Sequence, residues 1–342
     1  MVKRVQIIDH LNIISKFTLK RILNLILLKI SYLISKYIKK SVLFGKPFAL
    51  SIEPTTACNL GCPECPSGLK QFTRPTGKLT TDFHRQILQS IGNSVFYINY
   101  YFQGEPFLNP HFLDLIREAK QHKIYTATST NAHFIDEKTA DEIVQSGLDR
   151  LIISIDGTTQ ETYQSYRVHG QLNKVIEGTK LLIKAKKKLK SQTPFLIFQF
   201  LVVKPNEHQI PDIHNLANEL GVDEVRLKSA QLYDYENGNS LIPNQKKYTR
   251  YKRNRQGKYV LKYKTGNHCW RMWSSSVLTW DGKVVPCCFD KDAQHVLGSI
   301  ENEDFNTIWK NKSYQSFRFA ILNHRNDIDI CKNCSEGAKV WV

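Results

Sequence analysis

The sequence lacks a continuous apolar segment of the kind that crosses a lipid bilayer. No hydrophobic run approaches the ~20 residues that a membrane-spanning helix needs, although 41% of the 342 residues are hydrophobic. The N-terminus shows no secretory signal with a cleavage site, so a reducing cytoplasm is the expected compartment. The length and the ordinary composition, with 23% charged residues, predict a folded protein that buries a full core.

Acidic residues are almost missing from two segments, and these segments account for the net charge of +17. Residues 1–46 contain ten Lys and Arg but only one acid, Asp9. Residues 246–264 contain nine Lys and Arg and no acid, which leaves the rest of the chain at −1. The basicity therefore belongs to two segments and does not describe the whole fold.

The first basic segment is predicted to form one helix over residues 11–44, in which lysines interrupt an apolar pattern. Such a helix is typical of proteins that lie in the headgroup plane of an anionic membrane. The alternative is a helix whose apolar stripe packs on the protein body or on a second subunit. In residues 246–264, tyrosines alternate with basic residues, which suits an anionic substrate, a membrane or a solvated surface. No DNA- or RNA-binding motif occurs, so nucleic acid is not an expected partner.

Three cysteines follow an apolar run at residues 49–53. Cys58, Cys62 and Cys65 have the spacing C-x₃-C-x₂-C. Three thiolates on one short loop can hold three irons of a [4Fe–4S] cube, which normally takes four cysteines. The fourth iron would then be open to another ligand. A zinc site and buried unligated thiols are the alternatives, but zinc sites usually combine two Cys pairs or a Cys/His mix, and no such partner lies nearby.

Strand-like and helix-like segments alternate between residues 48 and 230. The predicted strands are 49–53, 95–102, 123–130, 150–155, 196–203 and 224–228, and the predicted helices are 81–91, 111–121, 136–146, 172–189 and 210–220. Gly147 and Gly221 stand where helices commonly end. Repeated βα units predict an α/β fold with a parallel sheet and right-handed crossovers, in which chemistry gathers at the carboxyl ends of the strands.

The cysteine loop resembles the signature of the radical S-adenosylmethionine (SAM) superfamily, and the resemblance extends from about Phe48 to the C-terminus. In that family a [4Fe–4S] cluster on the three cysteines chelates SAM through its open iron. Reductive cleavage of SAM gives a 5′-deoxyadenosyl radical that abstracts hydrogen from a substrate. The resemblance implies a six-stranded partial (β/α)6 TIM barrel. Glu64 stands where the family usually has an aromatic residue near the adenine.

Gly104, Glu105 and Pro106 follow the second predicted strand and match the family's GEP motif, with Gln103 in place of a common first glycine. The resemblance implies that this motif contacts the amino group of SAM. An ammonium group needs acceptors, and a glycine lets the backbone come close to it.

Two further motifs complete the implied SAM site. Thr130 and Asn131 close the third strand and match a TNG-like motif, with Ala132 where glycine is common. Ser154 closes the fourth strand, and Arg167 lies on the next loop. In related enzymes this serine and arginine hold the SAM carboxylate, for which a hydroxyl and a guanidinium are suited. The alternatives are a capping hydroxyl for Ser154 and a surface ion pair for Arg167.

A second group of cysteines lies near the C-terminus. Residues 275–280 and 283–286 are predicted to form a β-hairpin around an Asp-Gly turn, followed by a helix over 304–323. Cys269, Cys287, Cys331 and Cys334, with gaps of 18, 44 and 3, resemble the SPASM and twitch domains that follow radical SAM barrels. The resemblance implies one auxiliary [4Fe–4S] cluster, as in the shorter twitch form. A Cys₄ structural zinc is the alternative.

Cys288 is left over. In sulfatase-maturing relatives an aspartate that acts as the base occupies this position, so that role does not carry over to a thiol. The side chain is interpreted as a small buried hydrophobe, with an alternative ligand or a substrate-facing thiol as the other options. Asp290 is a candidate replacement for the base.

The expected organisation has four parts: a basic helical extension (1–46), a radical SAM barrel (47–235), a basic linker (236–266) and a small α+β cluster-binding domain (267–342). The expected function is hydrogen abstraction and two-electron oxidation of a carbohydrate, aminocyclitol or lipid-linked substrate. The alternatives are a peptide- or protein-modifying maturase and a non-catalytic membrane-surface protein with structural zinc. Flavodoxin or ferredoxin is the expected reductant. The expected location is the cytoplasm, with peripheral contact to the inner face of the cell membrane through residues 11–44.

Overall fold

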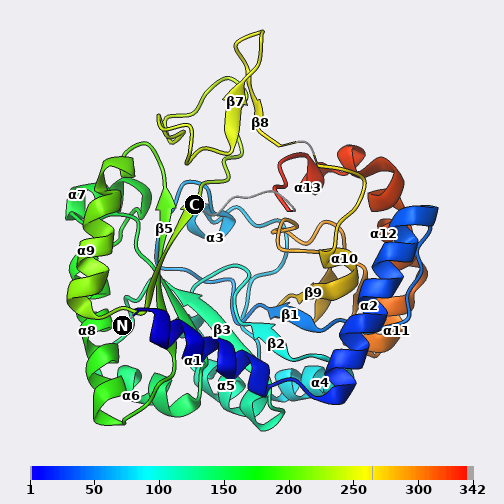
Figure 1. The fold of residues 1–342 in the computed structure, drawn as a ribbon, viewed down its shortest axis with the longest axis horizontal. Coiled ribbons are helices and arrows are strands. Elements are labelled where there is room, and N and C mark those ends of the chain that lie inside the picture. The colour runs from blue at the N-terminus through cyan, green and yellow to red at the C-terminus, as the bar shows by residue number, and fades with distance from the viewer. Residues whose placement is uncertain (1, 264, 337–342) are drawn as a thin grey trace.

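The fold is built on one sheet that carries both cysteine groups (Figure 1). A computed structural model describes residues 2–263 and 265–336, and within them this sheet has nine strands in the order β11-β10-β9-β1-β2-β3-β4-β5-β6. The bounds are β1 Ala49–Ile52, β2 Tyr97–Asn99, β3 Tyr125–Thr130, β4 Arg150–Ser154, β5 Phe195–Val202, β6 Glu224–Ser229, β9 Ser275–Leu278, β10 Lys283–Val285 and β11 Gly298–Ser299. Strands β1 to β6 are parallel to their neighbours, so the predicted partial (β/α)6 barrel is confirmed.

Helices cover the outside of the barrel. The longer ones are α4 Thr81–Ile91, α5 Phe112–Gln121, α6 Glu137–Ser146, α8 Leu172–Lys188 and α9 Ile210–Leu220, and short ones are α3 Pro66–Leu69, α7 Gln160–Tyr166, η1 Gly92–Ser94, η2 Pro106–Leu108 and η3 Glu207–Gln209. Thr80 and Asp136 cap α4 and α6, and Gly147 and Gly221 end α6 and α9 with positive φ. These local signals explain why the predicted helix bounds lie within one residue of the observed ones.

Alternation along the strands separates the core from the site. Ile98, Leu151 and Phe198 are fully buried in the layer between the sheet and the helices. Ser129 of β3 and Ser154 of β4 point to the opposite face of the sheet and line a cavity. Successive side chains of a strand point to opposite faces, so the same strands supply both the hydrophobic core and the polar cavity wall.

The C-terminal hairpin extends the barrel sheet. Strand β9 pairs in parallel with β1, with Ala49 opposite Ser275, and β10 returns antiparallel to β9 through a turn at Gly282, whose φ is 78°. The predicted hairpin is confirmed, but the sheet continues across the expected boundary between barrel and cluster domain. The four-part division therefore stays a prediction. The predicted helix over 304–323 is wrong at Asn311, which ends α11 Phe305–Lys310 and caps α12 Lys312–His324.

Helices α10 Arg271–Ser274 and α13 Asp329–Lys332, with η4 Arg325–Asp327, complete the C-terminal part. The basic linker forms a separate hairpin, β7 Tyr251–Arg253 and β8 Tyr259–Leu261, which projects from the barrel in Figure 1.

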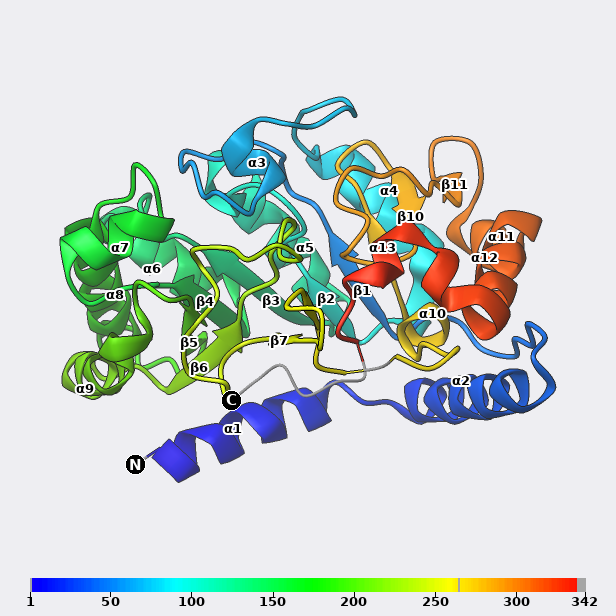
Figure 2. The same ribbon diagram turned by 90° about the horizontal axis from the view of Figure 1, so that it is seen from above.

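The N-terminal segment is two helices and not the predicted single one. Helix α1 covers Val2–Ser15 and α2 covers Leu19–Ile38, and Thr18 caps α2 by accepting from the Arg21 N–H. The two helices lie along one side of the molecule (Figure 2). In α1, Asp9 pairs with Arg150 and accepts from the Tyr125 hydroxyl. Within residues 2–263 and 265–336, none of the helices has the length and apolar character to cross a bilayer.

Arg21 holds α2 to the barrel. Its side chain is buried and donates to four backbone carbonyls, those of Lys16, Asn93, His122 and Lys123, at 2.7 to 3.2 Å. Since His122 and Lys123 directly precede β3, this one guanidinium fixes α2 against the amino ends of the strands.

We expect Arg21→Ala to lower the free energy of unfolding by about 3 kcal/mol, because buried carbonyls lose their donors. The neighbouring exposed Lys20→Ala should change it by less than about 0.5 kcal/mol. Urea unfolding of both variants measures this. Equal stability of the two variants would show that the Arg21 contacts do not anchor α2.

Candidate active site

The cysteine loop curls over the end of β1. Gly61 N–H donates to the Val168 carbonyl at 2.9 Å, and Cys65 N–H donates to the Cys62 carbonyl at 3.3 Å. A Cβ on Gly68 would lie 2.6 Å from Cys62 N, so only glycine lets α3 pack this close to the loop. These contacts turn the three thiols toward one cavity.

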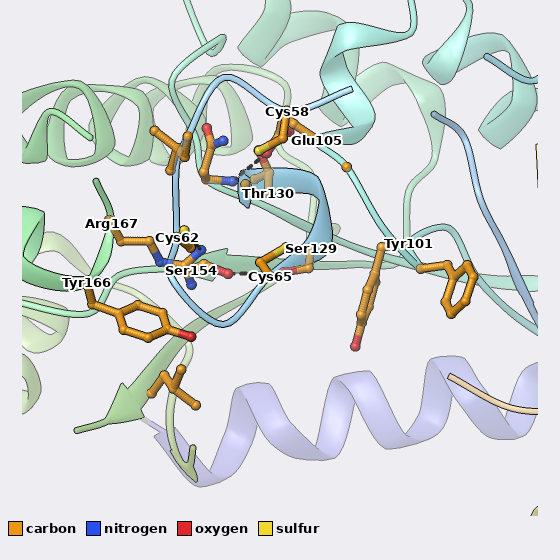
Figure 3. Close-up of a pocket in the computed structure, with 16 residues that line it drawn as sticks. Cys58, Cys62, Cys65, Tyr101, Glu105, Ser129, Thr130, Ser154, Tyr166 and Arg167 are labelled. Atoms are coloured by element: carbon orange, nitrogen blue, oxygen red, sulfur yellow. Dashed lines mark hydrogen bonds between the residues drawn. The ribbon is translucent and has the colours of Figure 1, made fainter. Parts of the chain in front are cut away.

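That cavity has a volume of about 160 Å³ and collects residues from the ends of successive strands (Figure 3). Its lining consists of Cys58, Leu60, Cys62, Cys65, Gly68, Tyr101, Phe102, Gly104, Glu105, Ser129, Thr130, Asn131, Ser154, Tyr166, Arg167 and Leu201. Nearly every residue that the sequence singled out for cluster and SAM binding is in this set. The exception is Pro106, which starts η2 behind Glu105.

The three thiols share a buried environment. Burial, with smaller contributions from Glu105 and the other two thiols, raises the pKa of Cys58 to about 11. Burial also raises the pKa of Cys62, while the Arg167 guanidinium, with Nη1 3.8 Å from the sulfur, opposes that rise. A cluster or metal that binds thiolates would remove this proton, and Arg167 favours the charged form.

The thiol spacing tests which metal group the loop fits. A zinc ion requires its ligands to meet at one point, at about 2.3 Å for each sulfur. In the part of the chain that the structure describes, no three His, Cys, Asp or Glu side chains converge in that way. Cys58, Cys62 and Cys65 instead surround a cavity. This arrangement suits a multi-iron cube with one thiolate per iron.

Glu105 is the buried acid of the cavity. Its carboxylate accepts from the Thr130 hydroxyl at 2.7 Å and from the Asn131 N–H at 2.8 Å. Burial raises its pKa to about 7, although these hydrogen bonds oppose the rise. The two predicted motifs, GEP and TN, are thus one hydrogen-bonded unit. Asn131 also donates to Asn59 of the cysteine loop at 2.8 Å.

Arg167 is held by a residue that the sequence analysis missed. Its Nε donates to Asp156 at 2.5 Å, and the other oxygen of Asp156 accepts from the Leu201 N–H at 2.6 Å. Asp156 is fully buried, so the guanidinium is oriented by a fixed carboxylate. Asp156 comes two residues after Ser154, at the carboxyl end of β4. This position next to a predicted site residue could have identified Asp156 from the sequence. Ser154 in turn shares a hydrogen bond with Ser129 at 3.2 Å.

Tyr101 and Tyr166 also line the cavity and were not predicted. Tyr101 continues the inward register of β2 after Tyr97 and Asn99, a signal that period-two alternation could have given. Glu64, which replaces the expected aromatic residue, does not line the cavity. Its carboxylate accepts from the Tyr233 N–H at 2.8 Å and so ties the cysteine loop to the loop after β6.

The second cysteine group surrounds a buried arginine that the sequence analysis also missed. Burial raises the pKa of Cys269 to about 11 and of Cys331 to about 12. The Arg325 guanidinium opposes both rises, and its Nη2 lies 3.5 Å from the sulfur of Cys334. Burial raises the pKa of Cys287, and Cys288, Cys269 and Cys334 add to the rise, so Cys287 is also close to this group.

The surroundings of Arg325 show whether the second cysteine group suits an iron–sulfur cluster. Its Nη1 donates to the carbonyls of Gly266 and His268, while its buried Nε lacks a hydrogen-bond partner among the described residues. A buried donor without an acceptor is costly. An anionic iron–sulfur cluster held by Cys269, Cys287, Cys331 and Cys334 would offer sulfur acceptors, so these residues fit such a group.

Cys288 and Asp290 are not among the residues that line the SAM-type cavity, although Cys288 packs in the cluster of Phe102, which does line it. Cys288 is half-buried and packs against the cluster of Phe102, Val277 and Val285, so its interpretation as a small buried hydrophobe stays a prediction. The buried Asp290 carboxylate accepts the N–H groups of Gln294 and His295 at 2.8 and 2.9 Å. Both carboxylate oxygens of Asp290 are therefore occupied within its own loop, which argues against the prediction that it is the base.

A parallel partial barrel whose strand ends bring three free thiols, a buried carboxylate and a guanidinium into one cavity defines a class: enzymes that bind an iron–sulfur cluster and SAM. Two family models match the chain, the radical SAM superfamily over residues 52–217 and the SPASM iron–sulfur cluster-binding domain over residues 269–335. The chain belongs to the radical SAM superfamily and is an enzyme. Its two domains imply a [4Fe–4S] cluster with SAM and an auxiliary iron–sulfur cluster.

Relatives cover most of the chain. The cofactor-modifying protein of tungsten-containing aldehyde ferredoxin oxidoreductase from Pyrococcus furiosus is 26% identical over 84% of this chain and 86% of the relative. A PqqA peptide cyclase from Bradyrhizobium diazoefficiens is 25% identical over 79% of this chain and 72% of the cyclase. Among solved structures, BtrN in complex with AdoMet and 2-DOIA has a TM-score of 0.54 at 18% identity, over 85% of this chain and 93% of BtrN. Streptococcus suis SuiB bound to precursor peptide SuiA has a TM-score of 0.61 at 16% identity, over 86% of this chain and 72% of SuiB. These structures support the fold.

Gly104 is the residue that allows the GEP turn to approach the cysteine loop. Its φ is +74°, and a Cβ there would lie 2.3 Å from the Thr55 carbonyl oxygen. We expect Gly104→Ala to lower the free energy of unfolding by about 3 kcal/mol, from φ strain plus the backbone clash.

Gly257 provides the matched control, since its φ is +77° and a Cβ would meet open space. Gly257→Ala should cost only about 1 kcal/mol of φ strain. Thermal unfolding of the two variants measures the difference. Equal losses would mean that the close approach at Gly104 is not required.

Proposed function

We propose that this enzyme cleaves SAM reductively and abstracts a hydrogen atom from its substrate, as the first half of a two-electron oxidation. The observation that carries the proposal is the single cavity in which three thiols meet the Glu105 and Arg167 groups. When bound on Cys58, Cys62 and Cys65, the cluster supplies the electron that breaks SAM into methionine and a 5′-deoxyadenosyl radical.

The residues of the chain position SAM. The Glu105 carboxylate accepts from the SAM ammonium, because a cation beside a buried carboxylate offsets the cost of its burial. Arg167, oriented by Asp156, and the Ser154 hydroxyl hold the SAM carboxylate. The apolar walls at Leu60 and Leu201 exclude water from the reacting atoms.

The second cysteine group completes the oxidation. Loss of a hydrogen atom leaves an unpaired electron on the substrate. A second electron must then leave, and a proton must pass to a base or to water, to give a closed-shell product. Cys269, Cys287, Cys331 and Cys334 would hold one auxiliary [4Fe–4S] cluster, which would supply an acceptor for this electron. Strand β10 leads to Cys287 and pairs with β9, and β9 lies beside β1, which leads to the SAM cysteines. The two cysteine groups therefore share one sheet.

We propose a carbohydrate, aminocyclitol or lipid-linked substrate with an anionic group. One auxiliary cluster suits the twitch form, and BtrN, solved with AdoMet and 2-DOIA, shares the fold. A groove of about 690 Å³ lies beside the β7–β8 hairpin. Its lining includes the cations Lys204, Lys246, Lys252, Arg253 and Lys262. Lys204 follows the carboxyl end of β5, so the groove opens on the side of the barrel where the chemistry occurs.

A peptide substrate is the second candidate. It is favoured by the likeness to PqqA peptide cyclases and to SuiB bound to its precursor peptide. The earlier alternative, a non-catalytic protein with structural zinc, is wrong because the chain belongs to a family of enzymes.

The proposal includes a partner and a place. Flavodoxin or ferredoxin supplies the electron to the SAM-binding cluster. The enzyme lies in the cytoplasm, with residues 11–44 against the inner face of the cell membrane.

The anaerobically reconstituted protein should contain about eight irons per chain and should form 5′-deoxyadenosine from SAM and dithionite. Cys62→Ala should abolish 5′-deoxyadenosine formation. Cys331→Ala should still cleave SAM but should no longer form the oxidised product from the substrate. Deuterium transfer from one labelled candidate into 5′-deoxyadenosine identifies the substrate class. Transfer from peptides and from no sugar or lipid-linked compound would replace the first candidate by the second.

The pKa of Glu105 predicts a pH dependence. Because this pKa is raised to about 7, the carboxylate gains charge between pH 6 and pH 8, and the affinity for the SAM ammonium should rise about tenfold over that range. Glu105→Gln should weaken SAM binding at pH 8 by about tenfold or more and remove the pH dependence. Equilibrium binding of SAM to the reconstituted protein tests this. A Gln variant that keeps the same slope would assign the titration to another group.

A further inference from the structure

Helix α2 turns its polar side toward the protein. The buried positions are Arg21, Leu28, Ser31, Tyr32 and Ser35. Ser35 Oγ donates to the Val42 carbonyl at 3.0 Å and accepts the Val42 N–H at 2.8 Å. Ser31 Oγ accepts the Phe44 N–H at 2.8 Å, and Tyr32 bonds to His268 at 3.1 Å. The helix is therefore attached mainly through hydrogen bonds, which leaves its apolar side unused.

The apolar side of α2 faces outward. Leu23, Ile26, Leu27, Ile30, Leu33 and Ile34 recur at the three- and four-residue spacing of one helix face, and all are exposed. Across α1, α2 and Phe44 the exposed fractions of such large apolar side chains run from 37% at Ile34 to 89% at Tyr37. An exposed apolar face of this extent marks an interaction site.

The face continues onto α1. Ile7, Leu11 and Ile14 are exposed at the same helical spacing, while Asp9 of α1 points to the barrel. Figure 2 shows α1 and α2 along one edge of the molecule, with no other drawn element beyond them among the described residues. The two helices thus present one elongated apolar surface, which we name the α1–α2 face.

We infer that the α1–α2 face docks on an anionic lipid bilayer, with the helices lying in the headgroup plane and their apolar side chains entering the acyl boundary. This inference deepens the membrane contact in the proposed function. It assigns the contact to a surface that includes α1, and it fixes which side of the enzyme meets the lipid.

Charge complementarity selects the lipid. Lys20, Lys29, Lys36, Lys39 and Lys40 are exposed beside the apolar stripe. The one acid of residues 1–46, Asp9, is buried and neutralised by Arg150. The face therefore offers only positive charge at its margins, which is the pattern of interfacial helices on anionic membranes.

The same charges disfavour a second copy of this chain as the occupant. A two-fold contact brings the same surface of both subunits together. Here it would place two segments of net charge +9 against each other with no exposed acid of the same segment to pair with them. A bilayer that contains phosphatidylglycerol neutralises these lysines.

The test is vesicle binding by the full-length reconstituted protein. Deletion of residues 1–43 is unsuitable, because it also removes Arg21 and Tyr32 from their packed positions. The double variant Ile26→Glu/Leu33→Glu changes two exposed residues seven apart on the face. We expect it to bind vesicles of phosphatidylcholine and phosphatidylglycerol about tenfold or more weakly. Val296→Glu, at an exposed apolar residue away from the face, should bind as the native chain does.

Two further arms test the charge argument. The native chain should bind pure phosphatidylcholine vesicles more weakly than mixed ones. Lys20→Gln/Lys36→Gln should lose about fivefold affinity for mixed vesicles for each lysine, with a smaller effect of salt. Equal binding to both kinds of vesicle would overturn the choice of an anionic bilayer.

Sedimentation velocity without lipid measures whether a second copy of the chain occupies the α1–α2 face. A dimer that Ile26→Glu/Leu33→Glu dissociates, in a native chain that does not bind vesicles, would overturn the inference and assign the face to a second copy. SAM cleavage is measured on the same samples. Cleavage without vesicle binding overturns only the membrane inference, and vesicle binding without cleavage overturns only the proposed chemistry.

Discussion

The carboxylate of Glu105 is the interaction on which the active site depends. Its oxygens accept from Thr130 and Asn131 at the end of β3, and its own N–H donates to the Ala57 carbonyl in the cysteine loop at 2.7 Å. The end of β2 therefore clamps both the neighbouring strand and the loop that carries the thiols. Burial of a carboxylate is costly, and it raises the pKa of Glu105 to about 7, although the hydrogen bonds and Arg167 oppose the rise. An ammonium group in the cavity would offset this cost, so in the proposed function the residue that organises the site also binds the amino group of SAM.

Local signals made the barrel and much of its site predictable from the sequence. Capping at Thr80 and the positive φ of Gly221 depend only on neighbours in the chain, and both helices begin or end at the predicted residues. The motifs at strand ends converge because parallel strands present their carboxyl ends on one side. Two of the missed contacts join residues that are far apart in the sequence. Asp9 pairs with Arg150, and Arg325 reaches back to Gly266 and His268, so only the folded chain shows these partners. The two helix breaks were missed because short polar caps interrupt otherwise helical patterns.

The orientation of α2 shows that a periodic pattern identifies an apolar helix face but does not determine whether that face turns toward the protein. Leucines and isoleucines at helical spacing identify an apolar face, but the usual assumption that this face packs on the body is an average over proteins. Here the barrel offers backbone carbonyls at Asn93, His122 and Lys123, which require donors. Arg21 satisfies them, and the small Ser31 and Ser35 let the helix approach closely. The surface that receives the helix therefore determines which face turns inward, and that surface is assembled from segments far away in the sequence.

The positions of the α1–α2 face and the cavity restrict how substrate arrives. The N-terminal helices contact Tyr125 and Arg150, the first residues of β3 and β4, whereas Thr130 and Ser154, the last residues of the same strands, line the cavity. A strand of six residues spans about 20 Å, so a bilayer at the α1–α2 face is at least about that far from the reacting atoms. A substrate embedded in that bilayer would need a polar part long enough to cover this distance. The basic groove beside β7 and β8 lies at the cavity end of the barrel, where it can hold such a part or a soluble anionic saccharide. In the inferred docking, the cavity therefore lies at the end of the barrel that faces away from the bilayer.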